Sequence, residues 1–181
     1  QQKFKLGIVG FGFVGQAVEY GFSTPDCEKM IVDPKYNSNS LSDLSGWNPN
    51  ITFLCLPTPS NDDGTINADL VEEAVRHLLQ ESDSFIVIKS TVTPDIVDKL
   101  TSLDGRIAYC PEFLTEGNAK MDFVNPPFHI FGVNNQEAGQ YLESIYGAMS
   151  ICNPCANIQV SAVEASYLKY MINSFLAMKV S

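Results

Sequence analysis

Short apolar runs recur along the chain, separated by polar segments or by stretches whose hydrophobic residues have helical spacing. Uninterrupted apolar runs of this kind are typical of strands covered on both faces of a sheet. They occupy residues 4–9, 30–32, 51–56, 85–89, 106–110, 128–131 and 158–160. Because strands and helices alternate, the pattern predicts an α/β protein with right-handed crossovers and a doubly wound, mainly parallel sheet.

Helix start signals lie between these runs. Asn67 is placed to cap a helix whose apolar stripe extends to Leu78. Pro94, followed by an aspartate, is typical of a first helical turn. A further helix is predicted over 136–146, whereas the polar segment 34–50 predicts a connection with one short helical turn.

The first apolar run ends in a glycine-rich turn, KLGIVGFGFVG, which contains Gly10, Gly12 and Gly15. Such glycines let the backbone turn tightly, approach a phosphate and pack the next helix, predicted over 14–22, against the sheet. The amino end of that helix would direct free N–H groups at a pyrophosphate. Asp33 ends the second run and is placed to hold the ribose hydroxyls of an NAD-type cofactor. The motif indicates a Rossmann-like NAD site, although a carboxylate at this position can also simply cap a turn.

Polar residues follow the later strands at their carboxyl ends. They form the segments Pro57-Thr58-Pro59, Ser90-Thr91-Val92 and PEFLTEG, which runs from Pro111 to Gly117. In doubly wound sheets, ligands lie beyond the carboxyl ends of the strands. We therefore expect these segments to meet the glycine turn at one crevice.

The last stretch, Ser161 to Ser181, can form a single long helix that is apolar nearly all round. One narrow stripe along it carries small and polar residues: Ala162, Ser166, Lys169, Asn173 and Ala177. An ammonium and an amide at i and i+4 could stabilise a developing oxyanion if the stripe faces the crevice. Alternatively, Lys169 extends to water and Asn173 satisfies a neighbour.

The amino-acid composition is typical of a globular domain and argues against some classes of partner. With 181 residues, 45% of them hydrophobic, the chain is expected to form one domain with a sizeable core. Its net charge of −10 argues against nucleic-acid or anionic-membrane partners, because both are polyanions. No apolar segment approaches the length of a membrane span, and no signal peptide is evident at the start.

Metal-binding and redox motifs are weak. The five cysteines are scattered, which favours a reducing, cytoplasmic location over a disulfide framework. The pair Cys152 and Cys155 has zinc-like spacing but lacks a second ligand pair, and the acids of 61–64 lack the spacing of a calcium loop. No metal site is expected.

As a set, the motifs resemble the nucleotide-sugar 6-dehydrogenases. The matching pieces, in that family's order, are GIVGFGFVG, VDP, FLCLPTP, IKSTV, PEFLTEGNA and EASYLKYMINSFLAMK. The resemblance spans nearly the whole chain, and it implies oxidation of a sugar C6 alcohol to a carboxylate by two hydride transfers to NAD. The EFLTEG loop is closest to the members that use UDP-glucose, the expected substrate, although GDP-mannose members share much of this loop.

The resemblance also implies residue roles. The implied cofactor-binding residues are Gly10, Gly12, Phe13, Val14, Gly15, Asp33, Lys35, Pro57, Thr58, Ser90, Thr91 and Glu116. The implied catalytic residues are Thr91, Glu112, Glu116, Lys169 and Asn173. The implied substrate-binding residues are Glu112, Phe113, Leu114, Thr115, Glu116, Lys169 and Asn173. Thr91 would order a water, Glu112 would act as acid/base, and Lys169 and Asn173 would stabilise the oxyanion.

The sequence departs from the family pattern at two places. The family's nucleophilic cysteine lies in a second α/β domain after the long helix, and none of the five cysteines falls in that motif. Phe128 and His129 stand where relatives usually carry a basic residue. The chain is therefore interpreted as residues 1–157, an NAD-binding domain, and residues 158–181, a connecting and dimerisation helix, without the substrate-binding domain. It would be the amino-terminal half of a longer enzyme or a natural short form.

Two functions of different classes remain open at this point. The first is the dehydrogenase, expected to be a homodimer through the last helix because that helix would otherwise expose a large apolar surface. The second is a non-catalytic NAD-binding or dimerisation module, which explains the glycines, Asp33 and the apolar helix. It does not explain the presence of Glu112, Lys169 and Asn173 together.

Overall fold

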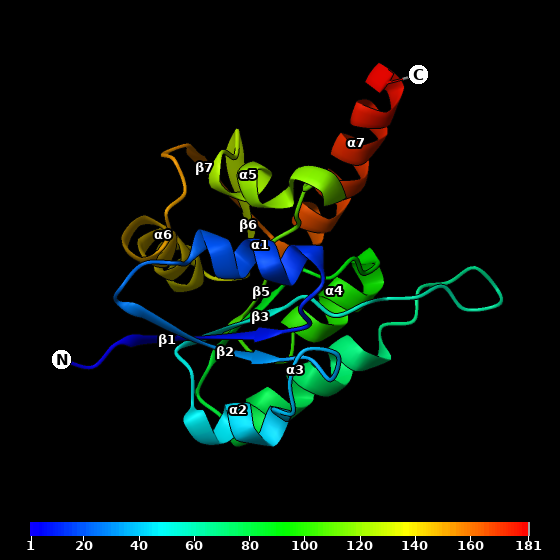
Figure 1. The fold of residues 1–181 in the computed structure, drawn as a ribbon. Coiled ribbons are helices and arrows are strands. Elements are labelled where there is room, and N and C mark those ends of the chain that lie inside the picture. Colours follow the sequence, from blue (N-terminus) through cyan, green and yellow to red (C-terminus); the bar gives the residue numbers. More distant parts are fainter. Residues whose placement is uncertain (181) are drawn as a thin grey trace.

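A computed structural model describes residues 1–180, which form a seven-stranded sheet between two layers of helices (Figure 1). The strands are β1 (Phe4–Val9), β2 (Cys27–Val32), β3 (Ile51–Leu54), β4 (Phe85–Ile88), β5 (Ile107–Tyr109), β6 (Phe128–Gly132) and β7 (Ala156–Val160). The helices are α1 (Phe13–Gly21), α2 (Leu41–Trp47), α3 (Asp69–Glu81), α4 (Pro94–Thr101), α5 (Ala119–Val124), α6 (Gln136–Met149) and α7 (Ala162–Val180), with a 3₁₀ turn at Glu116–Asn118. The predicted α/β doubly wound class is confirmed.

The strand order is β2-β1-β3-β4-β5-β6-β7, and the order reverses between β1 and β3. Strands β1 to β5 pair in parallel, so their carboxyl ends share one edge of the sheet. Ligands of doubly wound sheets bind in the crevice at such a reversal. The glycine turn after β1 and the segments after β3, β4 and β5 lie at this edge.

The expectation of crossovers throughout is wrong for the connection between β5 and β6. Strand β6 runs antiparallel to β5, joined through the register pair Tyr109 and Gly132, and β7 is parallel to β6. Between β5 and β6 the chain makes only a 3₁₀ turn and the six-residue helix α5. A helix of that length spans only about 9 Å, so the chain stays at the same end of the sheet and returns in the opposite direction.

Both faces of the sheet are covered. Helices α1, α5 and α6 contribute to the core on one face, where Phe22, Phe53 and Tyr146 pack together. Helices α2, α3, α4 and α7 contribute to the core on the other face. Burial on two sides explains why the strands are almost continuously apolar, since neither face can be polar.

Local sequence signals set most helix ends. Ser40 forms a capping box with Asp43, which begins a two-turn α2 where only one turn is expected. The Asn67 side chain accepts a hydrogen bond from the Asp69 N–H at the start of α3. Residues 158–160 belong to β7, which pairs with β6, and α7 starts at Ala162. The helix therefore begins one residue after Ser161, its expected start, and five residues after the end of the expected NAD-binding domain at residue 157.

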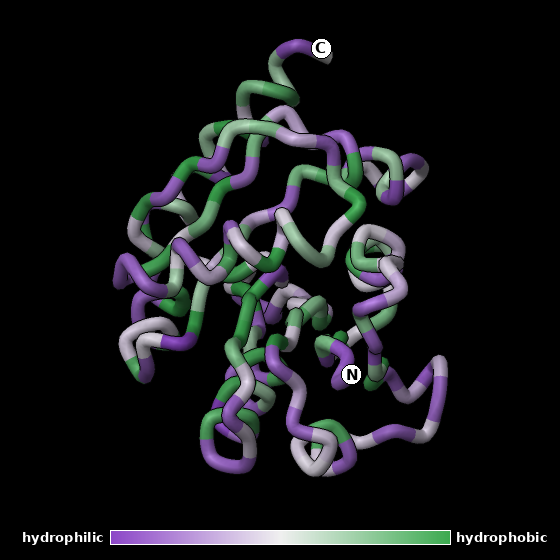
Figure 2. The backbone as a smooth tube through the Cα atoms, turned by 90° about the vertical axis from the view of Figure 1, so that its left-hand side faces the viewer, coloured by the Kyte–Doolittle hydropathy of each residue, from purple (hydrophilic) through white to green (hydrophobic). Residues whose placement is uncertain are grey.

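Of the two orientations that the sequence left open for the stripe of small and polar residues on α7, the structure has the one in which the first half of this stripe is buried. Its buried residues are the small and polar ones, Ala162, Ala165, Ser166 and Lys169. The fit against β6 explains this: a Cβ at Gly132 would lie 2.6 Å from the Ala165 Cβ, so only small residues can meet there. The large apolar side chains Tyr167, Tyr170, Met171, Phe175 and Leu176 are exposed. Hydrophobic residues continue along this helix toward its projecting carboxyl end (Figures 1 and 2).

Candidate functional site

The glycine turn combines two glycines that the fold requires and one that it does not. Gly10 has φ +93°, and a Cβ there would lie 2.4 Å from the Cys55 carbonyl oxygen. A Cβ on Gly15 would lie 2.1 Å from the Gly10 oxygen. A Cβ on Gly12 would meet nothing within 4 Å, although Gly12 is the N-cap of α1. Gly12 therefore leaves open space at a helix amino end, where N–H groups favour an anion.

Asp33 ties the glycine turn to the loop after β2. One carboxylate oxygen accepts the Phe11 N–H at 2.7 Å, and the other accepts the Lys35 N–H at 2.8 Å. The rings of Phe11 and Tyr36 lie 4.5 Å apart between the same segments. The turn-capping interpretation of Asp33 therefore describes part of its role. Each oxygen retains a lone pair that could accept a ribose hydroxyl.

The segments after β3 and β4 lie side by side. The Thr58 hydroxyl donates to the Thr91 carbonyl oxygen at 2.7 Å. Ser90 is buried, and its hydroxyl donates to the Leu54 carbonyl oxygen at 3.3 Å, so its side chain supports the strand ends. Pro57 is exposed beside them, and Phe13 and Val14 lie in the first turn of α1.

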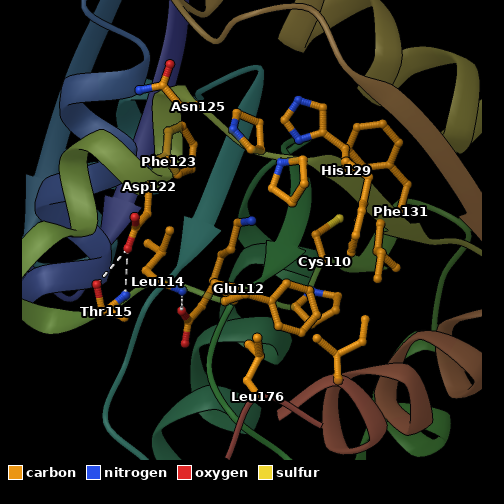
Figure 3. Close-up of a pocket in the computed structure, with 18 of the residues that line it drawn as sticks. Cys110, Glu112, Leu114, Thr115, Asp122, Phe123, Asn125, His129, Phe131 and Leu176 are labelled. Atoms are coloured by element: carbon orange, nitrogen blue, oxygen red, sulfur yellow. Dashed lines mark hydrogen bonds between the residues drawn. The ribbon is translucent and has the colours of Figure 1, made fainter. Parts of the chain in front are cut away.

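The loop after β5 is joined to α7 by a buried ion pair. The Lys169 amine donates to the Glu112 carbonyl oxygen at 3.0 Å and lies 3.3 Å from Glu112 Oε1. The Lys169 side chain is 4% exposed and that of Glu112 is 14% exposed. Glu112 Oε2 accepts the Leu114 N–H at 2.7 Å (Figure 3). The two charges that the sequence placed 57 residues apart therefore meet at this edge of the sheet.

The remaining predicted loop residues are more exposed. Thr115 donates through both its N–H and its hydroxyl to Asp122, which holds the loop against α5 (Figure 3). Phe113 packs edge to face against Phe128. Glu116 and Asn173 are exposed. Within residues 1–180, the structure does not bring Asn173 into a hydrogen bond with Glu112 or Lys169.

A cavity of about 550 Å³ adjoins this loop, between α5, the β5 and β6 strands and α7. Its walls are mainly aromatic and apolar and include Cys110, Phe123, Phe131, Tyr146 and Leu176 (Figure 3). Lys89, at the end of β4, and His129, in β6, also line it. No role was assigned to Lys89 from the sequence. The one feature of the sequence that could have pointed to it is the position of a lysine directly after a buried strand.

Burial controls protonation around the cavity. It lowers the pKa of His129 to about 4, with a further lowering from nearby Lys89. It raises the pKa of Cys110 to about 11 and that of Cys55 to about 12. All three groups are therefore uncharged near pH 7, and these two thiols are poor nucleophiles.

Residues 1–180 contain neither a candidate metal centre nor a candidate membrane-spanning helix. Within residues 1–180 there is no group of three or more His, Cys, Asp and Glu side chains arranged to hold a metal ion. Among the helices described, none combines the length and the apolar character that a bilayer span needs.

Comparison with known proteins identifies the family. Residues 42–150, more than half of the chain, match the NAD binding domain of the UDP-glucose/GDP-mannose dehydrogenase family. The chain belongs to this family. The resemblance seen in the motifs and the expectation of NAD as the cofactor are confirmed.

Relatives within the family carry different substrate names. The UDP-glucose 6-dehydrogenase of Rickettsia felis is 35% identical over 142 residues, which cover 74% of this chain and 32% of that protein. AglM, a UDP-glucose 6-dehydrogenase of Haloferax volcanii, is 35% identical over 72% of this chain and 34% of its own length. A GDP-mannose 6-dehydrogenase of Pseudomonas syringae is 28% identical over 72% of this chain. The chain thus spans about a third of the length of these relatives.

Solved structures of family members share the fold. A UDP-glucose dehydrogenase from Pyrobaculum islandicum superposes with a TM-score of 0.80 at 24% identity, covering 98% of this chain and 50% of that one. A GDP-mannose dehydrogenase from Pseudomonas aeruginosa gives a TM-score of 0.80 at 20% identity, with 97% and 50% coverage. At these identities the likeness establishes the Rossmann-like fold, and β7 and α7 are part of the shared architecture.

Proposed function

We propose that this chain is the NAD-binding part of a UDP-glucose 6-dehydrogenase, which oxidises UDP-glucose to UDP-glucuronate in two hydride transfers. The observation that carries the proposal is the buried Lys169–Glu112 pair, which joins α7 to the loop after β5. The pair lies at the carboxyl edge of the sheet, the same edge as the glycine turn. A generic cofactor module would have no need to bury an amine and a carboxylate there.

The cofactor half of the proposal rests on the glycine turn. The open space at Gly12 and the amino end of α1 fit a pyrophosphate. Asp33 and Lys35 would hold the ribose, and Pro57, Thr58, Ser90, Thr91 and Glu116 would line the path toward the nicotinamide. NAD, when bound, accepts the hydride from the substrate. The Asp33 carboxylate would repel the 2′-phosphate of NADP, so NAD is preferred.

The catalytic part of the proposal rests on the positions of the Lys169 and Glu112 charges. The buried Lys169 amine would stabilise the oxyanion that develops when the sugar alcohol is oxidised, with Asn173 one turn further along α7 as a second donor. Glu112 would exchange protons with a water held by Thr91. In the structure Lys169 is held by Glu112, so binding of the sugar would require the amine to turn partly toward the substrate.

The substrate assignment rests on the loop from Phe113 to Glu116, which resembles that of UDP-glucose enzymes. The GDP-mannose relative shows that related sequences use another nucleotide sugar. The thiol needed for the second oxidation is assigned to a substrate-binding domain outside the present sequence, since Cys55 and Cys110 are buried and protonated near pH 7. We further propose that the protein acts in the cytoplasm as a homodimer formed through α7.

Two measurements test this proposal. Isothermal titration calorimetry of the chain should show NAD binding at least tenfold tighter than NADP binding. The protein supplied with its substrate-binding domain should form NADH with UDP-glucose faster than with GDP-mannose. Lys169→Met should abolish NADH formation while NAD still binds. Tight NAD binding without NADH formation from any nucleotide sugar would instead support the non-catalytic module.

A further inference from the structure

Lys89 is a buried cation without a counter-ion. It follows β4 in the middle of the sheet, is 7% exposed, and lines the 550 Å³ cavity. Within residues 1–180 its amine forms no hydrogen bond or ion pair. It contacts the Phe123 ring, whose centroid lies 5.8 Å away, and its charge acts on the neighbouring groups Cys55, Cys110, His129 and Cys152. The amine is not among the fully enclosed polar atoms that lack a partner, so it is accessible from the cavity, where an anion can pair with it.

The carboxylates in the cavity wall do not neutralise the charge of Lys89, because each of them already binds other groups. Glu112 pairs with Lys169 and accepts the Leu114 N–H. Asp122 accepts hydrogen bonds from Thr115 (Figure 3) and also from Asn118. The neighbouring thiols of Cys55 and Cys110 are protonated near pH 7, since burial raises their pKa values. The cavity therefore offers an uncompensated positive charge.

The rest of the cavity suits a flat apolar body. Rings from α5, β6, α6, α7 and the loop after β5 line it, including Phe113, Phe123, Phe128, Phe131 and Tyr146. His129 is stacked on Phe131, with 5.5 Å between ring centroids, and is neutral near pH 7. The volume lies within the roughly 300–1,000 Å³ typical of small-molecule sites, which are mostly apolar with a few placed polar groups.

We propose that this cavity binds an aromatic carboxylate, with the carboxylate on the Lys89 amine and the ring system between Phe123, Phe131 and Tyr146. The site is separate from the glycine turn and does not depend on the proposed dehydrogenase function. Its wall includes the loop from Glu112 to Thr115, so occupancy would restrain that loop. If the proposed function also holds, an aromatic carboxylate would inhibit the enzyme through the substrate loop.

The test measures binding of 2-naphthoate to the full chain by calorimetry, without NAD. The neutral 2-naphthamide serves as a probe of the same shape. Wild-type protein should bind 2-naphthoate at least tenfold more tightly than 2-naphthamide. Lys89→Met should weaken 2-naphthoate binding at least tenfold and leave 2-naphthamide binding unchanged.

Two variants serve as controls. Lys3→Met removes an exposed lysine and should change neither affinity. Lys89→Arg keeps the charge and should retain 2-naphthoate binding within a few fold, which gives a second comparison if Lys89→Met does not fold by circular dichroism. Equal affinity for the two probes, binding indifferent to the charge at position 89, or no 2-naphthoate binding at millimolar concentration would each overturn the proposal.

Discussion

At the scale of single residues, the site depends on groups whose partners are fixed by burial. Lys169 and Glu112 form a nearly buried pair, whereas Lys99 and Glu72 form an exposed one at a similar distance. Removing one member of a buried pair leaves the other charge without compensation, but removing an exposed partner leaves a charge that water solvates. The two pairs therefore provide a matched comparison.

We expect Lys169→Met to lower the free energy of unfolding by roughly 3–5 kcal/mol at pH 7, because Glu112 loses its partner in a dry site. Lys99→Met should cost less than about 1 kcal/mol. Urea denaturation followed by circular dichroism measures both. Equal, small costs for the two substitutions would show that the Lys169–Glu112 pair is solvated.

The glycines of the first turn should separate into two classes. Gly12 has φ −75° and open space around its Cβ position, so Gly12→Val should leave the thermal unfolding midpoint nearly unchanged. The same change should weaken NAD binding at least tenfold, or about 1.4 kcal/mol, because the side chain fills the place expected for the pyrophosphate. Gly15→Val should instead destabilise the fold, since its Cβ meets the Gly10 oxygen. Calorimetry with NAD and thermal denaturation distinguish the two outcomes.

The stability of the folded protein should depend on pH through His129. Its pKa is about 4 in the folded chain because burial disfavours the charged ring, whereas an unfolded histidine titrates near 6.5. Between these values the unfolded state binds more protons, so this contribution to stability is complete above about pH 6.5 and is lost as the pH falls toward 4. His129→Phe should lose less stability than wild type over that interval. Urea denaturation at several pH values measures the difference, and parallel curves for the two proteins would contradict the expectation.

At the scale of elements, the close fit between α7 and β6 decides which side of the helix is buried. A Cβ at Gly132 would lie 2.4 Å from the Tyr109 oxygen as well as near Ala165. We expect Gly132→Ala to push α7 away from the sheet and to separate Lys169 from Glu112. Hydrogen exchange should then show faster exchange at the start of α7, while amides of β1 and β3 stay protected.

The strands were predictable from the sequence because burial on both faces leaves an unmistakable apolar run. The direction of β6 was not, since it depends on how far the connection after β5 carries the chain. Helical periodicity identified the stripe that contains Lys169, but it could not say which side faces the sheet. The meeting of Glu112 and Lys169 was expected from the position of Glu112 after a strand end and from the family motifs. Lys89 was missed because a single lysine after a strand has no repeating pattern.

At the scale of the whole molecule, several of the exposed large apolar side chains among residues 1–180 gather on α7. Tyr167, Met171 and Phe175 are each more than half exposed. Contiguous apolar surface of this kind is typical of interaction sites. The proposed homodimer would cover it with the same surface of a second copy.

We expect the wild-type chain to sediment as a dimer at micromolar concentration. Met171→Lys should shift it to monomer without lowering its thermal unfolding midpoint, because residue 171 is 67% exposed in the monomer. Lys3→Met is a suitable control at another exposed position. Sedimentation velocity distinguishes the species, and a monomeric wild type at tens of micromolar would contradict the proposed interface.

The return of the chain after β5 has a mechanical consequence. Because β5 and β6 are joined through a single register pair, while β6 and β7 share five, the sheet has a weakly paired seam between β5 and β6. Glu112 belongs to the part before the seam and Lys169 to the part after it. Their ion pair therefore links the two parts of the sheet, in addition to the apolar packing of α7 against α4, and a ligand that draws the amine away would weaken that link.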